Sequence, residues 1–169
     1  MGLPAKLKNW NIFANGDNYV GIAGEIALPK IAEKVETWRG AGMLAEVDIG
    51  MGLEKLEMET KFGGLVVGVL KQFAAVRIDD TMLRFNGAYQ EDVDGGVSAA
   101  ELVVRGKHIE IDPGTAKTGD NTEWTVKSTL TYLRWTVNGE VIVEIDVINC
   151  ILMIDGVDRM AQIRAAIGQ

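Results

Sequence analysis

The chain has 169 residues and a mass of 18.4 kDa, the size of one ordinary domain that can bury a core without disulfides or metal ions. Its composition is 47% hydrophobic and 24% charged, which excludes a disordered chain. Acidic residues outnumber basic residues 24 to 17, for a net charge of −7. This balance argues against a protein that holds nucleic acid through its phosphates or that docks on anionic membranes.

The first part of the chain predicts antiparallel strands joined by a tight turn. The cluster Asn15-Gly16-Asp17 tolerates positive φ and predicts a turn between strands at residues 9–13 and 18–22. Residues 30–39 alternate imperfectly between apolar and polar side chains, and residues 53–62 alternate cleanly. In the second of these stretches, the expected buried face consists of Leu56, Met58 and Phe62.

Residues 40–52 form a segment in which four glycines alternate with large apolar side chains. The apolar residues that need cover are Met43, Leu44, Val47, Ile49 and Met51. A loop or frayed strand of this length is uncommon and usually functional. Its apolar side chains either fold back on their own subunit or are covered by a neighbouring chain. The residues alone favour neither alternative.

Two later segments have helical rather than strand periodicity. In the first, the apolar positions recur at helical spacing, namely Leu65, Val66, Val69, Leu70, Phe73 and Val76. In the second, near the end of the chain, they are Val157, Met160, Ile163 and Ile167. Asp155 is the expected N-cap of this second helix, and Gly168 is placed to end it.

Strands fill most of the remaining sequence, at residues 82–89, 99–111 and 123–131. The dipeptide Asn138-Gly139 is the strongest short hairpin signal, and it predicts a turn between strands at residues 132–137 and 140–148. The prediction is therefore a single domain over residues 1–169, mainly β or α+β, with antiparallel strands, about two helices and an extended loop at about residues 40–52.

The single cysteine, Cys150, excludes an internal disulfide framework and a cysteine-rich zinc site. It lies in an apolar run, which predicts a buried, unreactive thiol. The first residues contain no apolar export segment, and no run approaches the ~20 apolar residues of a membrane helix. We therefore expect synthesis in a reducing cytoplasm and no membrane binding by the subunit itself.

Candidate catalytic and cofactor motifs fail on their context. The string Gly40-x-Gly42-x-x-Ala45 matches a dinucleotide fingerprint, but a charged stretch precedes it and no helix is predicted to follow. The carboxylate pairs Glu57 with Glu59 and Glu144 with Asp146 have α-carbons ~7 Å apart, within range for acid–base work, although solvated strand faces explain them better. The lone His108 predicts a hydrogen-bonded or surface imidazole rather than a metal ligand. The sequence thus predicts no enzyme, no cofactor and no metal.

Several short strings occur in an order and spacing that are fairly specific when they are taken together. They are Leu28-Pro29-Lys30, Arg39-Gly40-Ala41-Gly42-Met43, Met51-Gly52-Leu53-Glu54, Arg84-Phe85-Asn86-Gly87-Ala88-Tyr89, Val104-Arg105-Gly106-Lys107, Glu110-Ile111-Asp112-Pro113-Gly114, Glu144-Ile145-Asp146-Val147-Ile148-Asn149 and Ile154-Asp155-Gly156-Val157-Asp158-Arg159. Nearly end to end, the chain resembles the major tail tube proteins of P2-like contractile-tailed phages, a family shared with R-type tail-like bacteriocins.

The resemblance implies a β-sandwich or barrel-like subunit with a flanking helix, located in the inner tube of a virion tail. Six copies would form a ring with a continuous inner β-barrel, and stacked rings would form a channel for DNA passage or membrane puncture. The loop at residues 40–52 would then contact neighbouring copies. Expected partners are further copies of the chain, the contractile sheath protein, the tape-measure, baseplate and tail-terminator proteins, and double-stranded DNA that passes without specific binding.

An acidic channel wall would repel DNA phosphates and let the duplex slide. The candidate channel-facing residues are Glu57, Glu59, Glu140, Glu144 and Asp146, on two strands between which the sequence does not choose. The rival hypothesis is a monomeric β-barrel that binds a small molecule, or a weak hydrolase that uses a carboxylate pair. That rival predicts a monomer with a closed apolar pocket.

Overall fold

A computed structural model of the chain describes residues 2–169 and shows a mainly antiparallel β fold with two short helices. The strands are β1 (Lys6–Ala14), β2 (Asp17–Asn18), β3 (Ala23–Ala27), β4 (Glu33–Trp38), β5 (Val47–Leu53), β6 (Leu56–Phe62), β7 (Thr81–Gln90), β8 (Val97–Asp112), β9 (Trp124–Val137), β10 (Glu140–Asp146), β11 (Ile151–Ile154) and β12 (Val157–Asp158). The helices are α1 (Val67–Gln72) and α2 (Ala161–Ile167). Within the described residues, neither helix has the length and apolar character needed to cross a bilayer.

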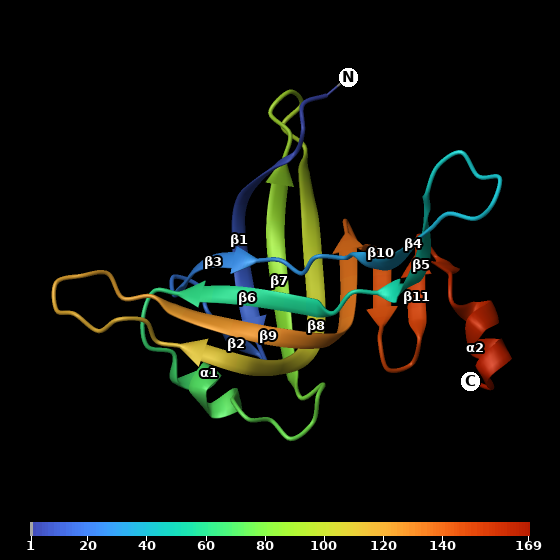
Figure 1. Cartoon of the computed structure of the whole chain (residues 1–169). Coiled ribbons are helices and arrows are strands. Elements are labelled where there is room, and N and C mark those ends of the chain that lie inside the picture. Colours follow the sequence, from blue (N-terminus) through green and yellow to red (C-terminus); the bar gives the residue numbers. More distant parts are fainter. Residues whose placement is uncertain (1) are drawn as a thin grey trace.

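The strands form two layers that share β8 and β9 (Figure 1). The long layer has the order β12-β11-β10-β9-β8-β7-β1-β2. The four-stranded layer consists of β3, β6, the first half of β9 and the last part of β8, because β6 pairs with β3 on one side and with residues 124–130 of β9 on the other. In Figure 1, β3, β6 and the first half of β9 run across β1, β7 and the first part of β8.

The bend of β8 between the layers depends on a glycine. The register between β8 and β9 shifts between Arg105 and Gly106 and again between His108 and Glu110. A Cβ atom on Gly106 would lie 1.9 Å from the carbonyl oxygen of Thr129, so only glycine allows the two strands to approach this closely.

The core lies between the two layers. Leu56, Met58 and Phe62 of β6 are buried there, as the alternating pattern predicts, and their neighbours of opposite parity face outward. The long layer contributes its own alternating face, whose most deeply buried side chains are Ile12, Phe85, Leu102, Val104, Leu133 and Ile145. Ordinary period-two patterning therefore explains the core.

Strands β4 and β5 form a separate hairpin that projects from the body (Figure 1). Ala27 lies opposite Glu59 and Glu33 lies opposite Leu53, so the same number of residues separates the two pairs on either strand. The hairpin is thus the outer half of one long ribbon whose inner half, β3 with β6, belongs to the four-stranded layer. Nearly every residue of β4 and β5 is exposed.

Several sequence predictions are wrong in detail. The expected strand at residues 18–22 is reduced to the two-residue β2, because the chain turns at residues 20–22. The expected helix through Val76 ends at Gln72, since Ala74 adopts a positive φ of 63°. Asp155 is not an N-cap but lies with Gly156 in the turn between β11 and β12, whereas Gly168 does end α2 in the left-handed conformation.

Cys150 is half-buried rather than buried, because it occupies a turn between β10 and β11 with a φ of 56°. The hairpin predicted at Asn138-Gly139 is confirmed, with β9 and β10 on either side of the turn. The strands expected separately at residues 123–131 and 132–137 are one continuous strand, β9.

Candidate functional site

One face of the projecting hairpin is apolar. Trp38 pairs with Val47, and Glu36 pairs with Ile49, so these side chains share a face with Met51. Trp38 is 57% exposed, and the other apolar side chains of this face are about half exposed. Of the sequence candidates, Val47, Ile49 and Met51 therefore come together. Trp38 was not among them, although its strand period would have placed it there.

The tip of the hairpin, residues 39–46, separates the other two candidates. Leu44 is 96% exposed and projects into solvent. Met43 is half-buried within the tip, where its Sδ accepts a hydrogen bond from the backbone N–H of Gly40 at 3.0 Å. The dinucleotide-like string therefore lies at the tip of a hairpin, without the strand-to-helix turn that a phosphate site requires.

The outer face of the four-stranded layer is polar. Glu59 lies opposite Lys127, which in turn lies opposite Glu110. In the two neighbouring rows the middle position on β9 is a threonine, Thr129 or Thr125, with a charged residue on either side. The charged side chains of this face are Glu25, Glu57, Glu59, Lys61, Lys107, Glu110, Asp112 and Lys127. With five acids and three lysines, the face is acidic overall.

Ion pairs with lysines neutralise part of the negative charge of this face. Glu57 pairs with Lys55 at 2.8 Å, and Glu110 pairs with Lys127 at 3.5 Å. The hydrogen bond and charge of Lys55 lower the pKa of Glu57 below its ordinary value. Because these groups are exposed, the pairs contribute little to folding stability, and they leave an ionised, hydrated surface at neutral pH.

The remaining acidic candidates lie on a different surface. Glu144 is opposite Arg134 and Asp146 is opposite Tyr132, both on the outer face of the long layer. Asp146 also accepts hydrogen bonds from the backbone and side chain of Asn149, which closes the turn after β10. Glu140 is exposed beside the β9–β10 turn. The structure therefore does not bring the β6 and β10 candidates together.

Two edges of the four-stranded layer have no strand partner within residues 2–169. β3 pairs with β6 on one side only, and residues 107–112 of β8 pair with β9 only, because β7 ends its pairing at Gly106. Open edges present unpaired backbone groups that favour strand addition. The sequence alone did not indicate these edges, since they depend on the layer order.

A second exposed apolar surface, which we call the 65–78 patch, surrounds α1. Val66 and Val69 are buried, whereas the side chains that make up the patch point outward, namely Leu65, Val67, Leu70, Phe73, Val76 and Ile78. Val76 is 97% exposed. The helical spacing located this segment, but the spacing alone does not show which of its apolar side chains the subunit covers.

His108 is buried beneath α1, with 4% of its surface exposed. Its Nε2 lies 3.1 Å from Oε1 of Gln72, and its Nδ1 lies 2.8 Å from Oγ of Ser128. Because an amide oxygen only accepts, the neutral ring donates from Nε2 and accepts the Ser128 hydroxyl at Nδ1. Burial lowers the pKa of His108 to about 4. Of the two alternatives that the sequence offered, a hydrogen-bonded or a surface imidazole, the structure shows the first.

The described residues 2–169 contain no group of three or more His, Cys, Asp or Glu side chains placed to hold a metal ion. The surface therefore offers assembly features: an apolar hairpin, an acidic sheet face with open edges, and an apolar patch.

Comparison with known proteins gives the family. The model of the family described as phage tail tube protein FII matches residues 4–168. The tail tube protein of Escherichia phage P2 is 44% identical over 171 residues, covering 99% of each chain. The major tail tube protein of Serratia phage KSP20 is 35% identical over 157 residues, covering 92% of this chain and 91% of its own.

Solved structures share the fold at very low identity. A sheath/tube terminator of an extracellular contractile injection system aligns with a TM-score of 0.57 and 4% identity, covering 76% of this chain and 94% of its own. A chain of the sheath–tube complex of the same kind of system gives 0.55 and 6%, covering 76% and 88%. A chain of the anti-feeding prophage baseplate gives 0.52 and 11%, covering 80% and 97%. The chain therefore belongs to the phage tail tube protein FII family, and it is a structural, non-enzymatic component of the tube of a contractile virion tail.

Proposed function

We propose that copies of this chain close into rings, that the rings stack into the inner tube of the tail, and that the tube encloses a channel for DNA passage. The observation that carries this proposal is the four-stranded layer, which combines an acidic outer face with two open edges. A closed ring of such layers satisfies the edges and turns the polar face toward a water-filled channel.

The strand directions favour this closure. All three pairings within the layer are antiparallel, so β3 and the end of β8 run in opposite directions. When the β3 edge of one copy meets the β8 edge of the next, the new pair is antiparallel as well. A head-to-tail contact of this kind generates a ring when its rotation closes. The resemblance to tail tube proteins implies six copies.

In this arrangement Glu57 and Glu59 face the channel. Their carboxylates repel DNA phosphates, so the duplex passes without being held by counterion release. Glu140, Glu144 and Asp146, candidates on the other strand, lie on or beside the long layer, whose outer face points away from the channel. The outer face of the long layer is therefore assigned to contacts with the surrounding sheath.

The hairpin of β4 and β5 continues the ribbon of β3 and β6 beyond the body of the subunit. It contacts a neighbouring copy through Leu44, Val47, Ile49 and Met51. Met43 supports the tip of the hairpin. Exposed apolar surface of this extent is typical of an interface. The likeness to chains of sheath–tube, terminator and baseplate assemblies supports tail-terminator and baseplate proteins as partners at the two ends. By the resemblance, a separate tape-measure protein is a further partner and sets the length of the tail.

Negative-stain microscopy and size-exclusion chromatography with light scattering test the proposal on the purified chain. Rings or hollow tubes of uniform width are the expected result. A strictly monomeric species at high protein concentration would contradict it and would favour the rival, a small-molecule-binding barrel.

A further inference from the structure

The long layer extends beyond the four-stranded layer that covers it. β7 has ten residues and is therefore about 30 Å long, whereas four strands side by side span only about 14 Å from the first backbone to the last. Because Thr81 at the start of β7 pairs with Gly106, the last part of β8 begins beside the start of β7. The uncovered part of the long layer therefore lies at the other end of β7, beyond β3 (Figure 1). We call this part the overhang; it consists of residues 6–10, 87–90 and 97–100.

The face of the overhang that continues the core is apolar. Leu7 and Phe85 both lie on this face, because a Cβ atom added to Gly87 would come within 3.1 Å of either side chain. The rings of Trp10 and Phe85 pack with their centroids 5.8 Å apart, and Tyr89 follows Phe85 and Gly87 on the same side of β7. Leu7 is 40% exposed, and Trp10 and Tyr89 are half-buried. The apolar face of the core thus continues past β3, where it is partly open to solvent.

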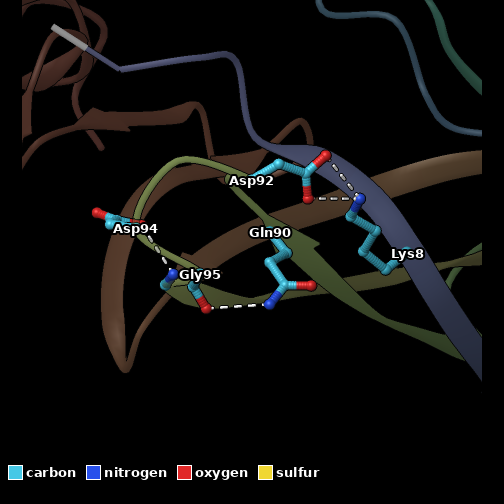
Figure 2. A network of polar contacts seen from close by, with 6 residues as sticks. Lys8, Gln90, Asp92, Asp94 and Gly95 are labelled. Atoms are coloured by element: carbon cyan, nitrogen blue, oxygen red, sulfur yellow. Dashed lines mark hydrogen bonds and ion pairs between the residues drawn. The ribbon is translucent and has the colours of Figure 1, made fainter.

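Polar contacts fix the shape of the overhang. Figure 2 shows Lys8 paired with Asp92 at 2.8 Å and Gln90 donating a hydrogen bond to the carbonyl oxygen of Gly95. Asp94 accepts a hydrogen bond from the backbone N–H two residues further on, which closes the β7–β8 loop. The surface is therefore ordered before a partner binds, and this order lowers the entropic cost of binding.

The 65–78 patch lies at the opposite edge of the four-stranded layer. His108, in the last part of β8, is buried beneath α1 and hydrogen-bonded to Gln72 of that helix. α1 therefore covers the core side of the β8 edge, and the overhang lies on the core side beyond the β3 edge. Leu70 and Phe73 of the patch are 43% and 47% exposed. In Figure 1 the overhang is at the top and α1 at the bottom, so the two apolar surfaces can meet only between two copies.

We propose that the overhang of one copy packs on the 65–78 patch of the next copy in the same ring. This inference rests on the proposed ring closure. When the β3 edge of one copy meets the β8 edge of the next, the overhang extends past that junction on the side where the neighbour's α1 lies. Its uncovered length of about 15 Å accommodates a helix, whose diameter with side chains is about 10 Å. Two contacts then close the ring, namely strand pairing beside the channel and apolar packing farther out.

Charge neither drives nor opposes this contact. The overhang and its loop carry two cations and three acids, namely Lys6, Lys8, Glu91, Asp92 and Asp94. The patch and the residues after it carry two of each, namely Lys71, Arg77, Asp79 and Asp80. One cation on each surface is already paired within its own subunit, Lys8 with Asp92 and Arg77 with Asp79. Burial of apolar surface therefore supplies the association.

Cross-linking of assembled protein tests the contact and its direction. Leu7→Cys and Leu70→Cys are introduced together in a Cys150→Ser chain. A short bismaleimide is then expected to give a ladder of covalent multimers that stops at the number of copies in one ring. The matched control combines Leu70→Cys with Val97→Cys, because Val97 is exposed on the opposite face of the overhang. No ladder, an equal ladder from the control, or a ladder that continues past one ring would overturn the inference.

A charge-pair experiment tests the same contact without a cross-linker. Leu7→Lys and Leu70→Glu each place an unpaired charge in the contact, so each is expected to raise the protein concentration needed for ring formation at least tenfold. The two substitutions together place a lysine opposite a glutamate, and that concentration is expected to fall again by about tenfold. Val97→Lys with Leu70→Glu is the control that should not recover. Single variants that assemble normally, or a combined variant that recovers no more than this control, would overturn the inference.

The outcomes distinguish this contact from the proposed function. Leu7 and Leu70 are both exposed in the subunit, so the melting temperature of each monomeric variant should stay within about 2 °C of the unmodified chain. Rings that form equally well from the single variants would overturn only the outer contact. If the unmodified chain forms neither rings nor tubes, the proposed function itself fails.

Discussion

His108 shows how a single buried side chain connects elements of the fold. It links α1 through Gln72 and β9 through Ser128, so the orientation of the helix depends on a neutral imidazole. Burial alone lowers the pKa of His108 to about 4, with no contribution from a nearby acidic group. Protonation would therefore place an uncompensated positive charge in the protein interior. The 65–78 patch is therefore supported from beneath by a group that tolerates only its uncharged form.

This arrangement predicts a pH dependence of stability. The pKa of His108 is about 6.5 in the unfolded chain and about 4 in the folded chain. Its contribution is fully present above pH 6.5 and is lost as the pH falls toward 4, by about 3 kcal/mol. Urea unfolding at several pH values should show that His108→Gln is less sensitive to pH than the unmodified chain between pH 6.5 and 4. Parallel pH profiles of the two chains would contradict this prediction.

Gly106 sets a steric limit at the bend of β8. A methyl group there would overlap the Thr129 carbonyl, which belongs to the backbone and cannot rotate away. Gly106→Ala is therefore expected to lower the free energy of unfolding by about 3 kcal/mol or more. Gly64→Ala is the matched control, because no atom lies within 4 Å of its added Cβ. Equal melting temperatures for the two variants would show that the strands separate easily at the bend.

At the scale of elements, the sequence predicts strands well where one face is buried. The alternation of Leu56, Met58 and Phe62 and the turn at Asn138-Gly139 are both confirmed. Helical spacing predicts less, because residues 65–78 include apolar side chains that the subunit leaves exposed. A pattern shows that a surface is apolar, but it does not show whether the same chain covers it.

The hairpin is expected to matter for assembly and not for folding. Replacing Val47, Ile49 and Met51 together with serine removes apolar side chains that contact solvent in the isolated subunit. The melting temperature of the monomer should change by no more than about 2 °C, whereas tube formation should be lost in light scattering and micrographs. Leu56→Ser, at a buried position of β6, is the control that should destabilise the monomer. A large loss of monomer stability in the triple variant would mean that the hairpin packs on its own body.

At the scale of the whole molecule, the layer order could not be predicted from the sequence. Which strands pair depends on contacts distant in sequence, such as the division of β9 between β6 and β10. This division places Glu57 and Glu59 on one layer and Glu144 on the other, so the two candidate acidic surfaces separate only once the topology is known. The two open edges follow from the same topology.

The two acidic surfaces can be compared by charge reversal. Glu57→Lys with Glu59→Lys is expected to make assembled tubes bind fluorescent double-stranded DNA at low salt, with an affinity that falls steeply as salt increases. Glu140→Lys with Glu144→Lys makes the same change in net charge away from the proposed channel. This second variant should raise the affinity of the tubes for DNA far less. A stronger effect from the β10 pair would reverse the assignment of the channel face.

The sharing of β8 and β9 by both layers has a mechanical consequence. Each strand passes from one layer into the other without a break in the chain, and the two remain paired across the bend except at two register shifts. A load applied along the wall is therefore carried by covalent backbone and strand ladders rather than by side-chain contacts that slide. A tube of such subunits should resist shortening and buckling while the surrounding machinery contracts.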